Sequence, residues 1–203
     1  MQELQKFLEE RLENCERLAV LGVGSLQSSD DAAGVVIASK IKESFEEEKY
    51  PGLRVYLGYT APENFTGEIK RFKPCHLIIL DAADMREEPG SIMVIQPEVI
   101  NGVSFSTHML PLKVMADYLK KETGCEMIIL GIQSVDVSYG GEMTPKVMEA
   151  VDEVTDIIGK VITATRGLSN KGTVPLLFRE THGDGSRGSR LGYSQILGDI
   201  PDT

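Results

Sequence analysis

The chain has 203 residues, a length that suits one globular domain with a sizeable core. Apolar residues make up 41% and charged residues 26%, as in ordinary globular proteins. The formal net charge of -10 argues against nucleic acid and against an anionic membrane surface as the main partner. No apolar run approaches the roughly 20 residues that span a bilayer.

The predicted elements alternate between helix and strand from the N-terminus onward. Residues 3–16 place leucines at helical spacing, and the apolar run 17–24, closed by glycines, predicts a central strand. Next come a helix over 31–48, a strand over 52–59, a short helix over 61–72 and a strand over 75–82. The last of these strands is apolar enough to be buried on both faces.

The second half of the chain continues the alternation. We predict a strand over 90–96, a helix over 110–124, a strand over 125–133 and a helix over 144–163, capped by Thr144 with Pro145 in its first position. This order predicts a single-domain three-layer α/β sandwich, with a mostly parallel twisted sheet and helices on both faces. We assign residues 1–164 to this domain. Residues 165–203, rich in glycine and serine, are predicted to form a flexible tail with a docked segment around 174–178.

The N-terminal segment and the cysteines indicate the compartment. The first 17 residues form a charged amphipathic helix rather than a signal peptide, so we expect a cytoplasmic protein. Cys15, Cys75 and Cys125 lie far apart in the sequence and form no CxxC motif. We expect all three to be reduced, structural thiols.

Candidate functional residues follow the predicted strands, because ligands of open parallel sheets gather beyond the carboxyl ends of the strands. Asp30 and Asp31 follow the first strand, Asp81 ends the third, and His108 lies in a loop before a helix. Two carboxylates and one imidazole at one rim suit a divalent first-row metal, and these ligand types do not select among nickel, zinc and iron. His76, at the start of its strand, falls at the wrong end for this site.

Each of these residues also has a simpler explanation. Asp31 can cap the helix that follows, since aspartate is a preferred N-cap residue. Asp81 can accept backbone N–H bonds at the end of a strand, and His108 can be an ordinary loop histidine.

A dinucleotide-binding site is a different interpretation of the glycine-rich turn. Gly22 and Gly24 fit the first two glycines of GxGxxG, but Gln27 stands at the third position. The strand over 52–59 lacks the terminal acidic residue that binds a ribose, and two aspartates would repel a pyrophosphate at the helix N-terminus. We therefore disfavour NAD binding.

Four segments resemble the hydrogenase maturation endopeptidases, which finish the large subunit of nickel–iron hydrogenases. They are LGVGSLQSSDDAAG, APENFTGEIKRFKPCHLIILDAADMREEPGSI, STHMLPL and LGIQSVDVSYGGEMTPKV. The APENF and STHMLPL segments look most like the branch that serves formate-hydrogenlyase and related membrane-bound hydrogenases. The resemblance covers roughly residues 17–162. Ser29 stands where the family usually has glycine, so we expect a restricted loop backbone there.

The resemblance implies a ligand set and an activity. By motif position, Asp31, Asp81 and His108 match the family's metal-binding and catalytic residues. The implied enzyme is a nickel-dependent aspartic-type endopeptidase that removes a C-terminal peptide from the precursor of a nickel–iron hydrogenase large subunit. The nickel is brought by the substrate and serves as the recognition element, and other divalent metals can substitute.

We expect a monomer that binds neither nucleic acid nor membrane. The alternative function is a non-catalytic, chaperone-like module that binds the nickel-bearing subunit.

Overall fold

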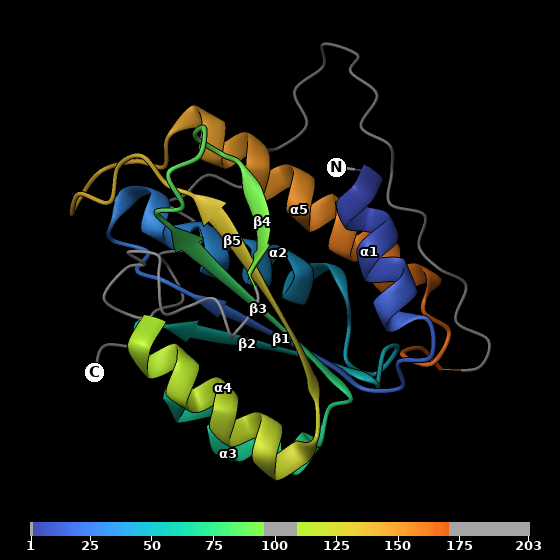
Figure 1. The fold of residues 1–203 in the computed structure, drawn as a ribbon. Coiled ribbons are helices and arrows are strands. Elements are labelled where there is room, and N and C mark those ends of the chain that lie inside the picture. Colours follow the sequence, from blue (N-terminus) through green and yellow to red (C-terminus); the bar gives the residue numbers. More distant parts are fainter. Residues whose placement is uncertain (1, 96–108, 171–203) are drawn as a thin grey trace.

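A five-stranded sheet in the order β2-β1-β3-β5-β4 forms the centre of the computed structural model, which describes residues 2–95 and 109–170 (Figure 1). The strands are β1 (Leu18–Val23), β2 (Leu53–Tyr59), β3 (His76–Ala83), β4 (Ile92–Ile95) and β5 (Glu126–Gln133). All neighbouring strands are parallel except β4, which pairs with β5 in the antiparallel direction. The helices are α1 (Gln2–Leu12), α2 (Ala33–Ser44), α3 (Thr66–Phe72), α4 (Met109–Thr123) and α5 (Pro145–Ala164). Two short 3₁₀ turns, η1 (Ser29–Ala32) and η2 (Pro62–Phe65), precede α2 and α3.

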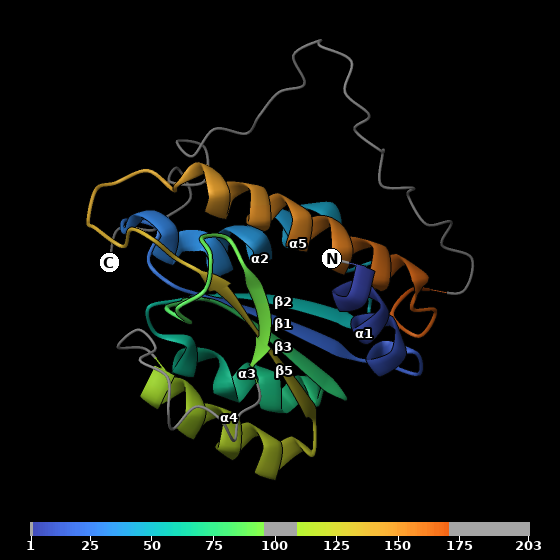
Figure 2. The same cartoon turned by 45° about the horizontal axis from the view of Figure 1, so that its top comes forward.

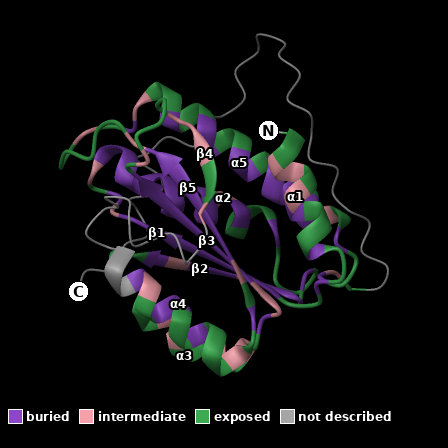
Figure 3. Cartoon of the chain, in the orientation of Figure 1, coloured by how far each residue is buried: buried purple, intermediate pink, exposed green. Residues whose placement is uncertain are grey.

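The helices form two layers on opposite faces of the sheet. Figure 2 shows α1, α2 and α5 over one face and α3 and α4 over the other. The central strands are therefore buried on both faces (Figure 3), and all six residues of β1 and seven of the eight in β3 are buried. These findings confirm the predicted three-layer α/β sandwich with a mostly parallel sheet.

The longest described helix, α5, packs against α2, α1 and strand β5 through one apolar stripe. Its buried positions include Val147, Val151, Val154 and Ile158, which recur at helical spacing on one face. Burying side chains of this size stabilises the fold by roughly 1.5–3 kcal/mol each. Pro145 occupies the first turn, where its missing N–H costs nothing. Within residues 2–95 and 109–170, neither α5 nor any other helix combines the length and apolar character needed to cross a membrane.

Helix α2 approaches the sheet through two glycines. A Cβ atom added to Gly34 would lie 2.2 Å from the carbonyl oxygen of Leu80 and 2.5 Å from that of Val23. A Cβ atom on Gly22 would lie 2.5 Å from the carbonyl oxygen of Gly34. The start of α2 is therefore pressed against the carboxyl ends of β1 and β3, which sets the position of the residues just before the helix.

Gly34→Ala is expected to lower the free energy of unfolding by about 3 kcal/mol, at the upper end of the usual cost of overpacking, because backbone oxygens cannot move aside as side chains do. Gly67→Ala in α3 is the matched control, since its added methyl would find only the Arg71 guanidinium, 3.8 Å away. Alanine favours a helix over glycine, so this control should be neutral or slightly stabilising. Urea unfolding of both variants measures the difference, and equal stabilities would contradict the close packing.

The helix predicted over 31–48 is shorter in the structure. It runs over Ala33–Ser44, and Asp31 lies in the preceding 3₁₀ turn. No side-chain capping bond is made at the start of either element, so the interpretation of Asp31 as an N-cap is wrong. The chain instead leaves β1 through a tight turn and enters α2 from it.

Residues 165–170, assigned to the tail on sequence, pack against the domain. Leu168 is buried, and its carbonyl accepts a hydrogen bond from the Gly52 N–H at 3.1 Å. The Asn170 N–H donates to the carbonyl of Lys49 at 3.0 Å. The folded part of the chain thus continues for at least six residues beyond position 164. The segment 174–178 lies outside the described residues.

Candidate active site

The turn after β1 carries two aspartates to the end of β3. Gly24 has a φ of +127°, and its N–H donates to the carbonyl of Tyr59 at 2.9 Å. A Cβ atom at Gly24 would lie 1.8 Å from the carbonyl oxygen of Asp31, so only glycine fits where the turn folds back on itself. Ser29, at the position where a restricted backbone was expected, takes a φ of +40°, a left-handed value that glycine reaches more easily.

Asp81 is a buried carboxylate at the carboxyl end of β3. It is 1% exposed, and neither of its carboxylate oxygens has a hydrogen-bond partner among the described residues. Among the described residues no backbone N–H reaches either oxygen with hydrogen-bond geometry, and the nearby Ala82 N–H only partly offsets the rise in the pKa of Asp81. Burial, and after it the nearby charge of Asp31, raises the pKa of Asp81 to about 8. A buried carboxyl group without partners is costly unless a proton or a cation neutralises it.

Asp31 lies beside Asp81 and is held by the glycine-rich turn. Its side chain is 6% exposed, and its Oδ2 accepts the N–H of Ser25 at 2.7 Å. This bond fixes the direction of the carboxylate within a loop that Gly24 and Gly34 already position. The two aspartates fit a site for a divalent cation, because the ion would supply the partner that Asp81 lacks. His108, the third predicted ligand, lies outside the described residues.

Asp30 has a different role from its neighbour. Its carboxylate is fully buried and accepts hydrogen bonds from the N–H groups of Val135, Asp136 and Thr144 at 2.9, 3.1 and 2.7 Å. Thr144 is the N-cap residue of α5, as predicted, but its hydroxyl makes no capping bond and instead donates to Asp30 at 3.1 Å. Asp30 therefore ties the loop between β5 and α5 to the glycine-rich turn.

Asp30→Ala is expected to lower the free energy of unfolding by about 2–3 kcal/mol, because it removes a charged acceptor from three backbone donors that stay partly buried. The exposed neighbour in the same network, Asp136, gives the control. Among the described residues its carboxylate bonds within its own turn alone, to the Ser138 N–H at 2.8 Å, so Asp136→Ala should cost less than about 1 kcal/mol. Amide hydrogen exchange at Val135 and Thr144 should become faster in Asp30→Ala and should not change in Asp136→Ala.

Gln133 is a structural residue whose role the sequence did not indicate. It is buried at the end of β5, where its Oε1 accepts the N–H groups of Met85 and Glu87 at 2.7 and 3.2 Å. Its Nε2 donates to the carbonyl of Ser134 at 2.8 Å. Gln133 thus orders the segment that follows β3. The one feature of the sequence that could have indicated this role is that Gln133 is a polar residue at the end of an apolar strand.

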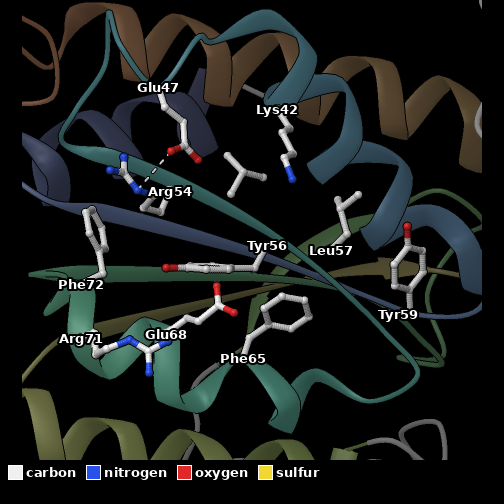
Figure 4. Close-up of a pocket in the computed structure, with 11 residues that line it drawn as sticks. Lys42, Glu47, Arg54, Tyr56, Leu57, Tyr59, Phe65, Glu68, Arg71 and Phe72 are labelled. Atoms are coloured by element: carbon white, nitrogen blue, oxygen red, sulfur yellow. Dashed lines mark ion pairs between the residues drawn. The ribbon is translucent and has the colours of Figure 1, made fainter. Parts of the chain in front are cut away.

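A pocket of about 650 Å³ opens along the edge strand β2 between α2 and α3 (Figure 4). The rings of Tyr56 and Phe65, with centroids 5.5 Å apart, lie in it, and Arg54 pairs with Glu47 at its rim at 3.4 Å. Tyr59, whose carbonyl binds Gly24, lines the end nearest the glycine-rich turn. Neither Asp31 nor Asp81 lines this pocket, so it does not contain the paired aspartates.

His76 lies at the amino end of β3, as predicted, and so at the edge of the sheet opposite Asp81. Cys15 and Cys75, which are 60 positions apart, come together next to it with their sulfur atoms 3.0 Å apart. Their separation in the sequence had suggested no relation between them. Cys125 is a buried free thiol, as expected.

Comparisons with known proteins indicate the family of the chain. The family model of the HycI hydrogenase maturation proteases matches residues 35–161. The hydrogenase 3 maturation protease of Escherichia coli K12 is 36% identical over 136 residues, covering 66% of this chain and 84% of that protein. The protein MJ0631 of Methanocaldococcus jannaschii is 36% identical over 140 residues, covering 67% of this chain and 83% of its own length.

Solved structures show the same similarity. The [NiFe] hydrogenase maturation protease HycI from Thermococcus kodakarensis KOD1 superposes with a TM-score of 0.71 at 28% identity, covering 77% of this chain and 98% of that one. A crystal structure of the hydrogenase 3 maturation protease superposes with a TM-score of 0.61 at 35% identity, covering 69% and 87% of the two chains.

Proposed function

The chain belongs to the hydrogenase maturation protease family, and we propose that it removes a C-terminal peptide from the nickel-loaded precursor of a nickel–iron hydrogenase large subunit. Membership makes it an endopeptidase, a hydrolase that processes hydrogenase. The nickel-loaded state of the substrate and the position of the cut are parts of the proposal.

The observation that carries the proposal is the buried, unpartnered carboxyl group of Asp81 beside Asp31. Together with the imidazole of His108, assigned by motif position, these side chains would supply three of the ligands of a divalent ion. Three protein ligands fill only part of a coordination sphere. The remaining positions would be taken by groups of the precursor that already hold the nickel, so a precursor without nickel would lack its anchor.

Two chemical roles for the carboxylates fit this arrangement. In the first, Asp31 and Asp81 hold the substrate's nickel, which as a Lewis acid polarises the scissile carbonyl or activates a water molecule. In the second, the nickel only positions the peptide, and Asp81 moves protons. A pKa of about 8 keeps its carboxyl group mostly protonated at pH 7, so it could donate a proton to the leaving amine.

The experiment is intact-mass measurement of a nickel-loaded large-subunit precursor after incubation with this protein, beside the nickel-free precursor. Loss of one discrete C-terminal peptide from the loaded form alone supports the proposal and locates the cut. Equal cleavage of both forms would overturn nickel recognition. A stable complex without cleavage would favour the chaperone-like module instead.

The protein would act as a monomer in the cytoplasm, as expected from the sequence. Its substrate would be another protein, and it would need neither nucleic acid nor insertion into a membrane. The three free thiols support a reducing compartment. Other divalent metals are expected to substitute for nickel, since carboxylate and imidazole ligands accept several first-row ions.

A further inference from the structure

Three metal-binding side chains meet at the edge of the sheet opposite the paired aspartates. Cys15 lies in the connection between α1 and β1, and Cys75 and His76 lie at the start of β3. One ligand atom from each lies within 4.8 Å of the others. The two sulfur atoms are 3.0 Å apart.

The histidine has the arrangement expected of a metal ligand. Its Nδ1 is buried and has no hydrogen-bond partner in the described part of the chain. Its Nε2 lies 3.6 Å from Oε2 of Glu126, within ion-pair range. Histidines that bind metals commonly direct one nitrogen at the ion and the other at a carboxylate, which fixes the ring. His76 has the carboxylate, and its other nitrogen has no partner among the described residues.

The two thiols differ in their surroundings, and each must lose its proton before it can bind a metal ion. Burial by itself would raise the pKa of Cys75, but hydrogen bonds from Cys15 and from the backbone of Arg17 bring it below the ordinary value. The N–H of Arg17 donates to Sγ of Cys75 at 3.3 Å. Burial raises the pKa of Cys15, so a bound cation must displace the proton of this thiol, and binding weakens at low pH.

We propose that Cys15, Cys75 and His76 form a second metal site, for a thiolate-preferring divalent ion of the zinc class. Two thiolates and one imidazole suit such an ion, and two negative charges balance its charge. Cys75 is half-buried, so a water molecule can take the fourth position from solvent. Binding releases the thiol protons to solvent and involves no oxidation.

The alternative is a disulfide between the same two cysteines. Tetrahedral zinc with sulfur bonds of about 2.3 Å holds its sulfur atoms roughly 3.8 Å apart, whereas a disulfide holds them about 2.05 Å apart. The observed 3.0 Å lies between these values, so either product needs a shift of less than about 1 Å. The imidazole decides the choice, because a disulfide would leave Nδ1 of His76 buried without a partner and a metal would not.

This site would stabilise the fold and take no part in peptide cleavage. His76 and Asp81 lie five residues apart on β3, which separates the two sites by roughly 16 Å. The metal would join the α1–β1 connection to the start of β3. It would raise the melting temperature with the logarithm of the ratio between the free metal concentration and its dissociation constant.

The test is titration of the reduced, metal-stripped full-length chain with Co²⁺, whose absorption reports thiolate ligands. We expect one ion per chain with a thiolate-to-cobalt charge-transfer band, displaced by Zn²⁺, and a melting temperature raised by Zn²⁺. Cys15→Ser and Cys75→Ser should lose the band and bind at least 10-fold more weakly. The aspartate site contains no thiolate, so Asp81→Asn should leave the band unchanged.

Cys125→Ser is the matched control, because Cys125 lies at the same edge of the sheet but packs in the core on the other face. It should keep the band. Absence of the band in the wild-type chain, or its persistence in Cys75→Ser, would overturn the proposal. The proposal would also be overturned if the chain without reductant has a mass 2 Da lower, which indicates a disulfide, and takes up no metal. If Cys15→Ser fails to fold, the proposal is tested by the wild-type titration and by Cys75→Ser. Cys75 is half-buried, so its replacement disturbs the core less.

Discussion

Asp81→Asn is expected to slow cleavage of the nickel-loaded precursor by at least 100-fold while the chain stays folded. Asparagine keeps the size of the side chain but can neither carry the charge that binds a cation nor exchange a proton with the substrate. Loss of an acid–base group alone costs about 10²–10⁴ in rate. Because both oxygens of Asp81 lack partners among the described residues, the substitution breaks no hydrogen bond there. The rate is measured by intact mass over time.

The control is Asp84→Asn, three residues along the chain. Asp84 is exposed, and its Oδ1 accepts hydrogen bonds from the Arg86 N–H at 3.2 Å and from Nε2 of Gln133 at 3.3 Å. Its carboxylate is therefore already occupied in the structure, and its replacement should change the rate less than about threefold. Full activity of Asp81→Asn would remove Asp81 from the site.

Binding measurements on Asp81→Asn and Asp31→Asn bear on the role of the carboxylates. If the variants still bind the nickel-loaded precursor in preference to the nickel-free one but do not cut it, proton transfer is favoured. If binding and cleavage are lost together, the carboxylates act through the metal, as ligands.

The second large effect is a loss of stability of the metal-free protein as the pH rises. The pKa of Asp81 is raised from 3.8 to about 8 on folding, so between these values the folded chain holds a proton that the unfolded chain has released. Its contribution is therefore fully present below pH 3.8 and is lost as the pH rises through about 8. The slope is about 1.4 kcal/mol per pH unit, or on the order of 4 kcal/mol between pH 5 and pH 8.

Urea unfolding in the presence of a chelator, at several pH values between 5 and 8, measures this effect. Other groups titrate in the same range, so the relevant quantity is the difference between the wild type and Asp81→Asn. Asparagine does not titrate, and the variant should gain stability over the wild type steadily as the pH rises. A difference that stays constant with pH would mean that Asp81 is already ionised at pH 5.

The order of the elements and the position of the two aspartates were readable from the sequence. Short apolar runs predicted the four parallel strands, and helical spacing predicted the helices that cover them. Asp31 and Asp81 were found because each follows a strand, and the carboxyl ends of parallel strands meet at one edge. These features depend on residues that are neighbours in the chain, so local patterning is enough to specify them.

Only the tertiary structure decided what the polar residues bind. Asp30 and Asp31 are adjacent and chemically identical, yet one binds a loop more than 100 positions away and the other lies beside Asp81. Cys15 and Cys75 meet across 60 positions because β1 and β3 are neighbours in the sheet. Such contacts depend on strand order and on the close approach of α2 at Gly34, which follow from packing the whole chain and leave no mark in any short segment.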